Sequence, residues 1–415
     1  MVVQHNMQAM NASRMLGITT EAQGKSTEKL SSGFRINRAA DDAAGLSISE
    51  KMRKQIRGLD QASTNASDGV SAVQTAEGAL TEVHAMLQRM NELAVQAANG
   101  TNSETDRQSI QDEVDQLTTE IDRVAETTKF NETYLLKGDP DGTSKTVYFD
   151  FKDAGLDGKY LGVTETANNA SVTIKATMMT AGSNVTIGGK EYTILSSDAG
   201  DTTKDYYTAA ADVDGGVSKN DSRLITNTKA VSLMLTELAA ANSVGSATAI
   251  TAPTYTATNA NVDANPSAFT ITKGSNTTTQ ALAFNLHVGA DADMTNKIGV
   301  DIETMDTKYL GINKLNVKDD TGIAATYAID AISGAVAKVS AQRSSLGAIQ
   351  NRLEHSIANL DNVVENSTAA ESRIRDTDMA DEMVRYSKNN ILAQAGQSML
   401  AQANQATQGV LSLLQ

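Results

Sequence analysis

Residues 17–26 are the part of the chain that most resembles a nucleotide-binding loop. The segment ends in Gly24-Lys25-Ser26, and phosphate-binding loops end in a similar way because the lysine contacts the phosphates and the hydroxyl contacts the metal ion. However, six residues separate Gly17 from Gly24, whereas such loops have four, and no strand pattern precedes Gly17. We therefore predict no nucleotide site here and no bound cofactor in the chain.

Acidic and histidine residues form no complete metal-binding pattern. Asp291 and Asp293 begin a run that resembles a calcium loop, but Asn296 stands where the loop needs glycine and Ile302 where it needs a bidentate glutamate. A solvated turn explains this run more simply. None of the histidines belongs to the His-Glu-x-x-His pattern of zinc proteases: His5, His84, His287 and His355. We therefore predict no metal site, no catalytic residue and a protein that is not an enzyme.

The composition excludes further classes of function. The 415 residues include no cysteine, which excludes disulfides, thiolate catalysis and cysteine-based metal sites. The net charge of −15 argues against nucleic acid and anionic membranes as partners, because both attract clustered lysine and arginine. Residues 1–7 contain no apolar stretch of the kind found in signal peptides. No run of about 18 apolar residues is present, so we predict no membrane-spanning segment.

The N-terminal section has the pattern of two long helices. All three prolines lie in the middle of the chain, which leaves both ends free of a residue that costs a helix interior about 3 kcal/mol. Apolar residues recur at alternating steps of three and four, which is the spacing of a heptad seam. On helices expected at about 68–98 and 104–128, the seam residues are Val73, Ala76, Leu80, Val83, Leu87, Met90, Ala94 and Ala97, then Ile110, Val114, Leu117, Ile121 and Val124.

The turn between these helices carries stop and start signals. Asn99 and Gly100 should end the first helix, with Gly100 in the left-handed conformation that glycine adopts easily. Ser103 should cap the second helix, with Asp106 as its capping-box partner. We therefore predict an antiparallel helical hairpin.

The C-terminal section has a seam of matching length. Its members are Ile332, Val336, Val339, Leu346, Leu353, Ile357, Leu360 and Val364, with Arg343 and Gln350 as polar exceptions. A helix of this span is on the order of 50–60 Å long and cannot bury its stripe alone. We predict that it packs on the N-terminal hairpin, so that both chain ends close one bundle. The alternative is that each end forms a separate coiled-coil domain.

The extreme ends have weaker amphipathic stripes. Residues 1–30 and about 379–415 place alanine, glycine and methionine beside leucine, so each turn buries little apolar surface. Polar breaks at 31–42 and 373–378 separate these stripes from the bundle. Such helices are marginal alone and should become ordered only when they pack against one another.

The middle of the chain has a different pattern. Residues 171–175 and 184–195 alternate between apolar and polar types, which predicts strands and a hairpin with a glycine turn. Residues from about 218 to 242 have helical spacing. The predicted fold class is therefore mainly α with a β-rich insertion, in which both chain ends form a long antiparallel bundle and the insertion forms an α+β domain.

Several long motifs resemble those of bacterial flagellin, in the order that the family has them. Residues 30–49 and 87–96 resemble its N-terminal signatures, and residues 344–355, 370–380 and 402–415 resemble its C-terminal half. The resemblance implies three parts. These are inner-core helices at 1–42 and 375–415, an outer-core bundle with a β-hairpin at 43–137 and 285–374, and a variable, surface-exposed insertion at 138–284.

The resemblance also implies a function and partners. The chain would be a structural subunit that polymerises with itself into the extracellular flagellar filament for motility. It would leave the cell unfolded through the flagellar type III apparatus, which the absence of cysteine suits. Further partners would be an export chaperone, the filament cap and the hook-junction proteins.

Two host-recognition motifs follow from the same resemblance. Flagellins that Toll-like receptor 5 recognises contribute residues that match Arg89, Leu93 and Glu113. Arg89 and Leu93 are four residues apart and off the seam, so we expect both to point outward. A filament contact is the alternative role of this patch. A C-terminal motif that intracellular inflammasome sensors read corresponds to Val410, Leu411, Leu413 and Leu414.

A second hypothesis concerns the insertion. It would carry an adhesin or glycan-bearing role on a flagellin scaffold, because its many serine and threonine residues offer hydroxyls for glycosylation.

Overall fold

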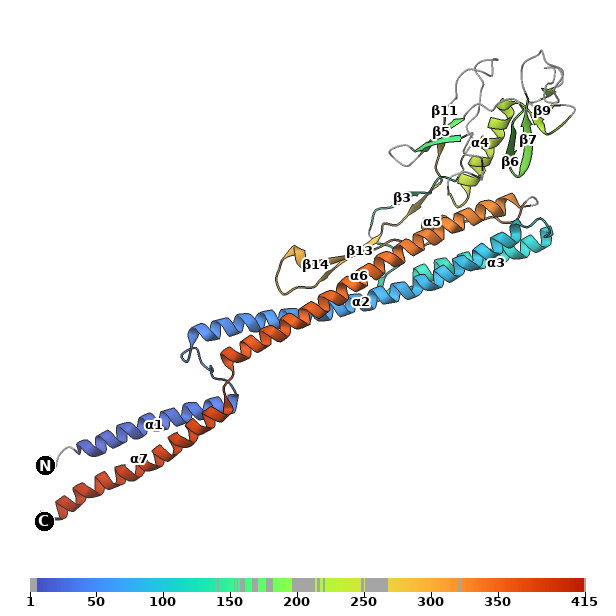
Figure 1. Cartoon of the computed structure of the whole chain (residues 1–415). Coiled ribbons are helices and arrows are strands. Elements are labelled where there is room, and N and C mark those ends of the chain that lie inside the picture. Colours follow the sequence, from blue (N-terminus) through green and yellow to red (C-terminus); the bar gives the residue numbers. More distant parts are fainter. Residues whose placement is uncertain are drawn as a thin grey trace. The chain divides into compact units, whose positions relative to one another are not determined.

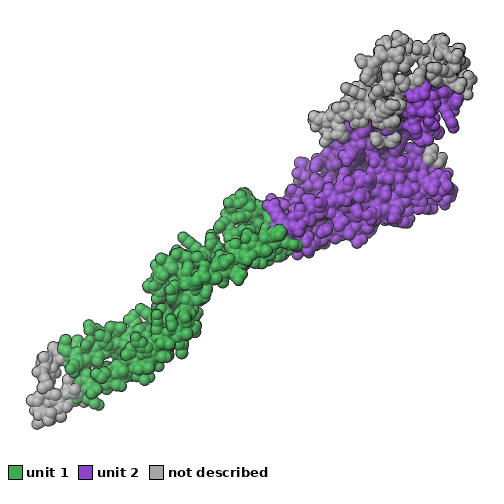
Figure 2. Space-filling view, viewed as in Figure 1, with its two compact units in different colours: residues 1–67, 286–298, 353–415 green, residues 68–285, 299–352 purple. Residues whose placement is uncertain are grey.

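The computed structural model describes residues 6–139, 142–152, 154, 156, 161–165, 171–176, 182–195, 213–214, 217–218, 221–247, 250, 268–319 and 322–413. Long helices from both chain ends and a strand-rich middle make up this part of the chain (Figure 1). Two compact units can be distinguished (Figure 2). The first comprises residues 1–67, 286–298 and 353–415, and the second comprises residues 68–285 and 299–352.

The helices are mainly long and come mostly from the two chain ends. In chain order they are α1 (Met7–Ser32), α2 (Ala43–Ala98), α3 (Glu104–Thr127), α4 (Asn227–Ser243), α5 (Thr307–Leu310), α6 (Ile323–Arg375) and α7 (Met379–Leu413). The 56 residues of α2 and the 53 of α6 exceed the predicted spans. Both helices begin earlier than predicted, where an acidic side chain bonds to a free backbone N–H group. At α2, Asp42 accepts a hydrogen bond from the backbone N of Gly45. At α6, Asp319 accepts one from the backbone N of Ile323.

In the second unit, α2, α3 and the first part of α6 form a bundle. An ion pair joins α2 to α3, with 2.9 Å between Arg89 Nε and Glu113 Oε1. Another joins α2 to α6, with 3.7 Å between Arg343 Nη2 and Glu77 Oε1. Buried seam residues line this bundle: Val73, Leu80, Val83, Leu87, Met90, Ile110, Val114, Ile121, Ile332, Val339 and Leu346. Leu117 and Val336 are half-buried.

In the first unit, the remaining seam residues lie on the C-terminal part of α6. Leu353 and Leu360 are buried there, and Ile357 is half-buried. The N-terminal part of α2 buries only small residues, such as Ala62 and Ala66. Small side chains explain why the heptad pattern fades in this part of the sequence although the helix continues.

The turn between α2 and α3 confirms one prediction and corrects another. Ser103 caps α3 and forms a complete capping box with Asp106. Gly100, however, is not among the residues with positive φ. A glycine C-cap is not needed here, because Asn102 donates to the carbonyl of Gln96 and the Arg107 guanidinium to that of Ala97.

Strands fill most of the described middle of the chain. Antiparallel pairs form between β1 (Lys129–Phe130) and β2 (Thr133–Tyr134), and between β3 (Lys145–Tyr148) and β12 (Ser275–Thr278). A three-stranded sheet has the order β11 (Ala268–Thr272), β5 (Ser171–Ala176) and β4 (Leu161–Glu165). A five-stranded sheet has the order β6 (Asn184–Ile187), β7 (Lys190–Ile194), β10 (Leu224–Ile225), β9 (Val217–Ser218) and β8 (Val213–Asp214), with β7 and β10 parallel.

One face of α4 packs on strands and forms the core of the insertion. Buried residues of this core come from α4 and from several strands: Val172, Val185, Ile187, Ile194, Ile225, Val231, Met234, Leu235, Leu238 and Ile271. The helix begins at Asn227, nine residues later than predicted, because Leu224–Ile225 pairs as a strand and Thr226 then caps the helix. The predicted strands at 171–175 and 184–195 are present as β5, β6 and β7.

A hairpin returns the chain toward α6. It consists of β13 (Leu282–His287), a 3₁₀ turn η2 (Met294–Asn296) and β14 (Lys297–Ile302). Its tip contacts α2 within the first unit, where Asn65 Nδ2 donates to the carbonyl of His287 over 3.1 Å. Asp293 and Asn296 of the calcium-like run serve as a helix cap and a turn residue.

Candidate interaction surfaces

Helices α1 and α7 run side by side (Figure 1). Both helices leave large apolar side chains exposed. Asn6 at the start of α1 donates to the carbonyl of Ala403 on α7 over 3.0 Å. Ten of the sixteen large apolar side chains that are exposed in the described chain belong to these two helices: Met7, Met10, Met15, Ile18, Met379, Met383, Val384, Ile391, Leu392 and Met399. An apolar surface of this kind usually marks a protein–protein interface.

A groove of about 850 Å³ lies between α1 and α7. Its walls come from both helices, with Met15 and Leu16 on α1 and Leu392, Gly396 and Met399 on α7. Gly396 lies against Leu16, since a Cβ atom built at this position would be in ordinary van der Waals contact with Leu16 Cδ1, at 3.4 Å. The two helices thus meet at this point, while Met15 and Met399 in the groove walls remain exposed.

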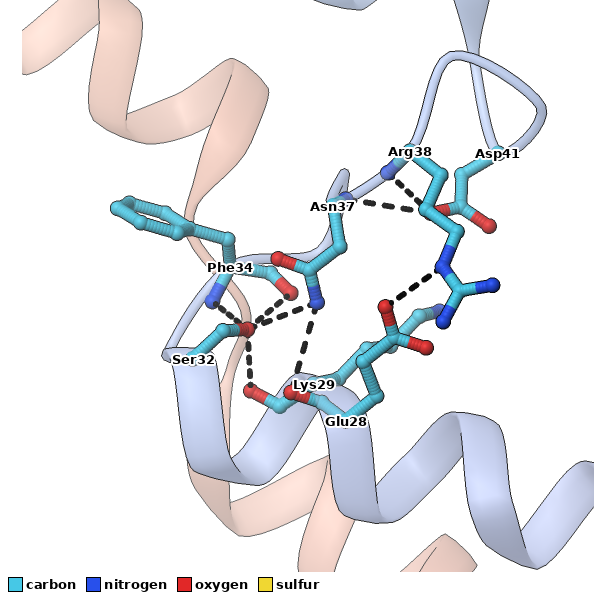
Figure 3. Close-up of polar contacts among 7 residues, drawn as sticks. All are labelled: Glu28, Lys29, Ser32, Phe34, Asn37, Arg38 and Asp41. Atoms are coloured by element: carbon cyan, nitrogen blue, oxygen red, sulfur yellow. Dashed lines mark hydrogen bonds and ion pairs between the residues drawn. The ribbon is translucent and has the colours of Figure 1, made fainter.

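The loop between α1 and α2 is held by local hydrogen bonds (Figure 3). Asn37 Nδ2 donates to the Ser32 hydroxyl over 2.8 Å, and Arg38 Nε donates to Glu28 Oε1 over 2.9 Å. Asp41 Oδ2 accepts from the backbone N–H groups of Arg38 and Asn37, and these two bonds lower the pKa of the Asp41 carboxyl. The first polar break is therefore a defined turn.

The two polar breaks of the sequence pair with each other. Phe34 and Asp376 form an antiparallel β-bridge, and the backbone N of Arg35 donates to the carbonyl of Arg375 over 2.7 Å. The Arg375 guanidinium lies 4.8 Å from the centre of the Phe34 ring and also donates to Glu50 Oε1 over 2.9 Å. This pairing fixes where α1 ends relative to the start of α7.

The proposed receptor patch contains an exposed ion pair. Arg89 on α2 bonds to Glu113 on α3 and, over 3.1 Å, to Glu92 on its own helix. The hydrogen bond to Glu113, followed by that to Glu92, raises the pKa of Arg89. About half of the Arg89 side chain, 51%, remains exposed. A partner can therefore reach both members of the pair.

The structure corrects the prediction that Leu93 points outward. Leu93 is only 2% exposed. Because Arg89 and Leu93 are four residues apart, they share one face of α2, and the bond from Arg89 to Glu113 shows that this face is turned toward α3. The long arginine reaches past the interface, whereas the shorter leucine stays within it. A helix with two partners buries a stripe wider than a two-position seam.

The side chains of the C-terminal motif lie outside the described part of the chain. The backbone of Val410, Leu411 and Leu413 belongs to α7, whereas Leu414 follows the last described residue. His5 likewise precedes the first described residue.

Arg107 is a buried residue that the sequence analysis missed. It is 3% exposed, and its guanidinium donates to the carbonyls of Ala97 over 3.0 Å, Asn99 over 3.2 Å and Asp319 over 2.6 Å. It therefore joins the end of α2, the start of α3 and the segment before α6. Its position in the sequence could have indicated its burial. Arg107 lies three residues before Ile110 and so continues the apolar seam of α3 with a charged residue.

The described residues form no candidate metal centre. No group of three or more histidine, aspartate or glutamate side chains in that part of the chain could hold a metal ion. None of the described helices is long and apolar enough to cross a membrane.

Comparison with known proteins identifies the family. Residues 3–140 match the bacterial flagellin N-terminal helical region, and residues 329–414 match the C-terminal helical region. The flagellin of Clostridium tyrobutyricum is 45% identical over 98% of this chain and 100% of its own. The flagellin of Bacillus subtilis (strain 168) is 39% identical over the full length of both chains.

A solved structure is also similar. The crystal structure of Bacillus cereus flagellin matches 72% of this chain and 88% of its own at 18% identity, with a TM-score of 0.33. The two family regions and the full-length identities show that the chain belongs to the bacterial flagellin family.

Proposed function

We propose that the chain is a structural, non-catalytic subunit that polymerises into the bacterial flagellar filament outside the cell and serves motility. The observation that carries this proposal is the row of exposed apolar side chains on α1 and α7. Each copy of the chain carries the same row, so copies that associate head to tail can cover one another along an open helical assembly. Membership of the flagellin family supports this role.

The proposal assigns a layer to each part of the chain. Residues 1–42 and 375–415 form the inner core of the filament, where neighbouring copies cover the exposed methionines. Residues 43–137 and 285–374, including the β-hairpin, form the outer core, whose seam is already buried within one chain. Residues 138–284 form the insertion on the filament surface. The export chaperone, the filament cap and the hook-junction proteins are the other proposed partners.

Removal of residues 379–415 tests the assembly model. The shortened chain should remain a soluble, folded monomer, because the buried seam of the second unit is intact, but it should form no filaments in a sedimentation assay. A finer test replaces Val384 and Ile391, which are 69% and 66% exposed, with serine. Tyr148→Ser, at an exposed apolar residue of the insertion, is the matched control. Filaments from the Val384→Ser, Ile391→Ser chain in normal yield would contradict the proposal.

We further propose that the patch of Arg89, Leu93 and Glu113 binds Toll-like receptor 5. The exposed ion pair favours this role, with Leu93 supporting Arg89 from within the bundle. Arg89→Ala and Glu113→Ala should weaken binding of the monomer to the receptor ectodomain in a titration. The control is Arg123→Ala, which removes an exposed arginine that is paired with Glu120 on the same hairpin. Equal binding by all three variants would refute this assignment.

The leucine-rich end with Val410, Leu411, Leu413 and Leu414 is proposed as the element that inflammasome sensors read. The substitutions Leu411→Ser and Leu413→Ser should abolish sensor activation by protein delivered into the host cell.

The alternative role of the insertion as an adhesin or glycan carrier is tested by the intact mass of native filaments. A mass equal to that of the unmodified chain rejects glycosylation.

A further inference from the structure

A pocket of about 240 Å³ lies in the second unit beside the first half of α6. Residues 149–152 form one wall, and α6 forms another. Two lysines share this pocket, Lys152 from the segment after β3 and Lys338 from α6. Their counter-charges are exposed carboxylates, Asp150 beside Lys152 and Asp330 on α6. Phe149 and Phe151 supply its aromatic lining.

The backbone of Lys152 is clamped by one buried side chain. Asn242 on α4 is 4% exposed, and its Oδ1 accepts from the backbone N of Lys152 over 3.0 Å. Its Nδ2 donates to the carbonyl of Lys152 over 2.9 Å and to that of Leu238 over 2.8 Å. A single amide thus satisfies both backbone groups of Lys152. The backbone of Lys152 is thereby fixed beside the pocket, and its half-buried side chain lines the pocket wall.

Lys338 keeps a second positive charge in the same pocket. Its Nζ donates to the carbonyl of Tyr309 over 2.7 Å and lies 4.9 Å from the Phe149 ring centre and 5.0 Å from that of Tyr309. Carbonyl and ring faces both stabilise an ammonium group. Two ammonium groups in one small pocket repel each other, whereas the carboxylate of Asp330 favours the Lys152 ammonium.

The titration of the two amines agrees with this geometry. Burial is the main cause that lowers the pKa of Lys152 to about 8; the charge of Asp330 opposes this effect, and the smaller effect of the Lys338 charge adds to it. Burial also lowers the pKa of Lys338, which Asp150 opposes. Tyr309 lies against Lys338, and burial raises the pKa of Tyr309 to about 12, so it stays neutral. A minority of the Lys152 amine, far larger than for an ordinary lysine, is therefore neutral near physiological pH.

We propose that Lys152 is a modification site, at which the amine that shares the pocket with Lys338 takes an acyl group from a small activated donor. Acyl phosphates and acyl thioesters share this chemistry. The lone pair of Lys152 Nζ attacks the carbonyl carbon, so an N–C bond forms and the C–O or C–S bond breaks. Phosphate or thiolate leaves with the bonding electron pair, and the nitrogen gives one proton to solvent. The product is a neutral amide that no longer repels Lys338.

Acetyl phosphate is the probe for this site. The full-length chain is treated briefly at pH 7.5, and peptide-mapping mass spectrometry compares acetylation of Lys152 with that of Lys190, an exposed lysine after a turn. About a quarter of an amine with a pKa near 8 is neutral at this pH, compared with about one in a thousand for an ordinary lysine. A less basic amine is also a weaker nucleophile, so we expect Lys152 to react roughly tenfold faster.

Two charge variants with opposite signs separate this mechanism from simple exposure. Asp330→Asn removes a negative charge that favours the ammonium form, so acetylation of Lys152 should become faster at pH 7.5. Lys338→Gln removes the repelling positive charge, so acetylation should become slower. Both differences should vanish near pH 10, where the Lys152 amine is neutral in every variant. Asn242→Ala should reduce the selectivity for Lys152 over Lys190.

Thermal unfolding of each variant checks that the fold is retained. The proposal is overturned if Lys152 reacts no faster than Lys190, or if the two charge variants change the rate in the same direction. Acetyl-coenzyme A in place of acetyl phosphate then distinguishes the donors. Selective acetylation by only one of them identifies that class as the donor for this site.

Discussion

Both carboxylate oxygens of Asp122 on α3 accept hydrogen bonds from Thr307, the first residue of α5. The backbone N–H of Thr307 donates to one oxygen over 2.8 Å, and the Thr307 hydroxyl donates to the other over 2.9 Å. Thr307 is only 2% exposed. The chain that returns from the hairpin is therefore fixed to α3 by a half-buried carboxylate that bonds to a buried threonine.

Asp122→Ala tests this connection. Hydrogen bonds to charged groups contribute about 1.5–3 kcal/mol, and the substitution leaves the buried Thr307 hydroxyl without its acceptor, so we expect the free energy of unfolding to fall by about 2 kcal/mol. Urea denaturation measures this loss. Glu126→Ala, an exposed carboxylate on the same helix, should change it by less than about 0.5 kcal/mol. Similar losses for the two variants would show that Asp122 has no special role.

Asp306 should make stability depend on pH. Burial raises the pKa of Asp306 above its ordinary 3.8, and the charge of Asp122 adds to this, although the hydrogen bond from Tyr309 opposes it. A carboxyl with a raised pKa in the folded state stabilises the fold below its ordinary pKa, and this contribution is lost as the pH rises through the folded-state value. Asp306→Asn keeps a helix-capping side chain without the charge, so we expect the variant to be more stable than the native chain at pH 7.

The gain from Asp306→Asn should shrink as the pH falls toward 3.8. Urea denaturation at pH 7 and at pH 4 measures the difference. Asp293→Asn is the matched control, because this exposed capping residue has a pKa lowered by its bonds from Thr295. A lowered pKa stabilises the fold above the ordinary value, so this variant should lose stability at pH 7. Stabilisation by both substitutions at pH 7 would contradict the argument.

Arg107→Lys should destabilise the end of the bundle although it conserves the charge. A lysine cannot reach three carbonyls that the planar guanidinium contacts in different directions. We expect a loss of about 2–3 kcal/mol, since buried acceptors lose their charged donor. The control is Arg123→Lys, whose arginine is 59% exposed and should tolerate the change. Chemical denaturation measures the free energy of unfolding of both variants. An unchanged value for Arg107→Lys would rule out this role.

Gly245→Ala and Gly189→Ala separate a steric clash from backbone strain. Both glycines have left-handed φ, 79° at Gly245 and 73° at Gly189, so alanine is strained at either position by about 1 kcal/mol. A Cβ atom at Gly245 would also lie 1.8 Å from the carbonyl oxygen of Gly311, whereas one at Gly189 would meet nothing within 4 Å. We expect Gly245→Ala to lower the melting temperature several degrees more than Gly189→Ala. Equal shifts would mean that the Gly245 turn can move away from Gly311.

Periodicity alone predicted the bundle well. Steps of three and four through Val73, Leu80 and Leu87 recur because each such residue must face another helix, and all three are buried. The same reasoning failed for Leu93, because a two-position seam assumes one partner whereas α2 has two. It also failed for the early part of α2, where buried alanines leave no strong apolar signal.

Some contacts between distant segments could not be predicted from the sequence. The polar breaks around Phe34 and Asp376 were each visible as interruptions, but their pairing depends on a separation of 342 residues in the chain that no local pattern encodes. Gly100 shows a related limit. A glycine after a helix suggests a left-handed cap, yet Arg107 and Asn102 satisfy the free carbonyls of α2 in its place.

Six of the ten exposed apolar residues on α1 and α7 are methionines: Met7, Met10, Met15, Met379, Met383 and Met399. Among these ten side chains, those of methionine are the ones that peroxide oxidises readily, because it converts their thioether into a polar sulfoxide. Oxidants would therefore reach the contact surface of the free chain, whereas the same sulfur atoms would be shielded once neighbouring copies cover them. Because methionines make up much of this surface, the unassembled chain is the form that is sensitive to oxidation.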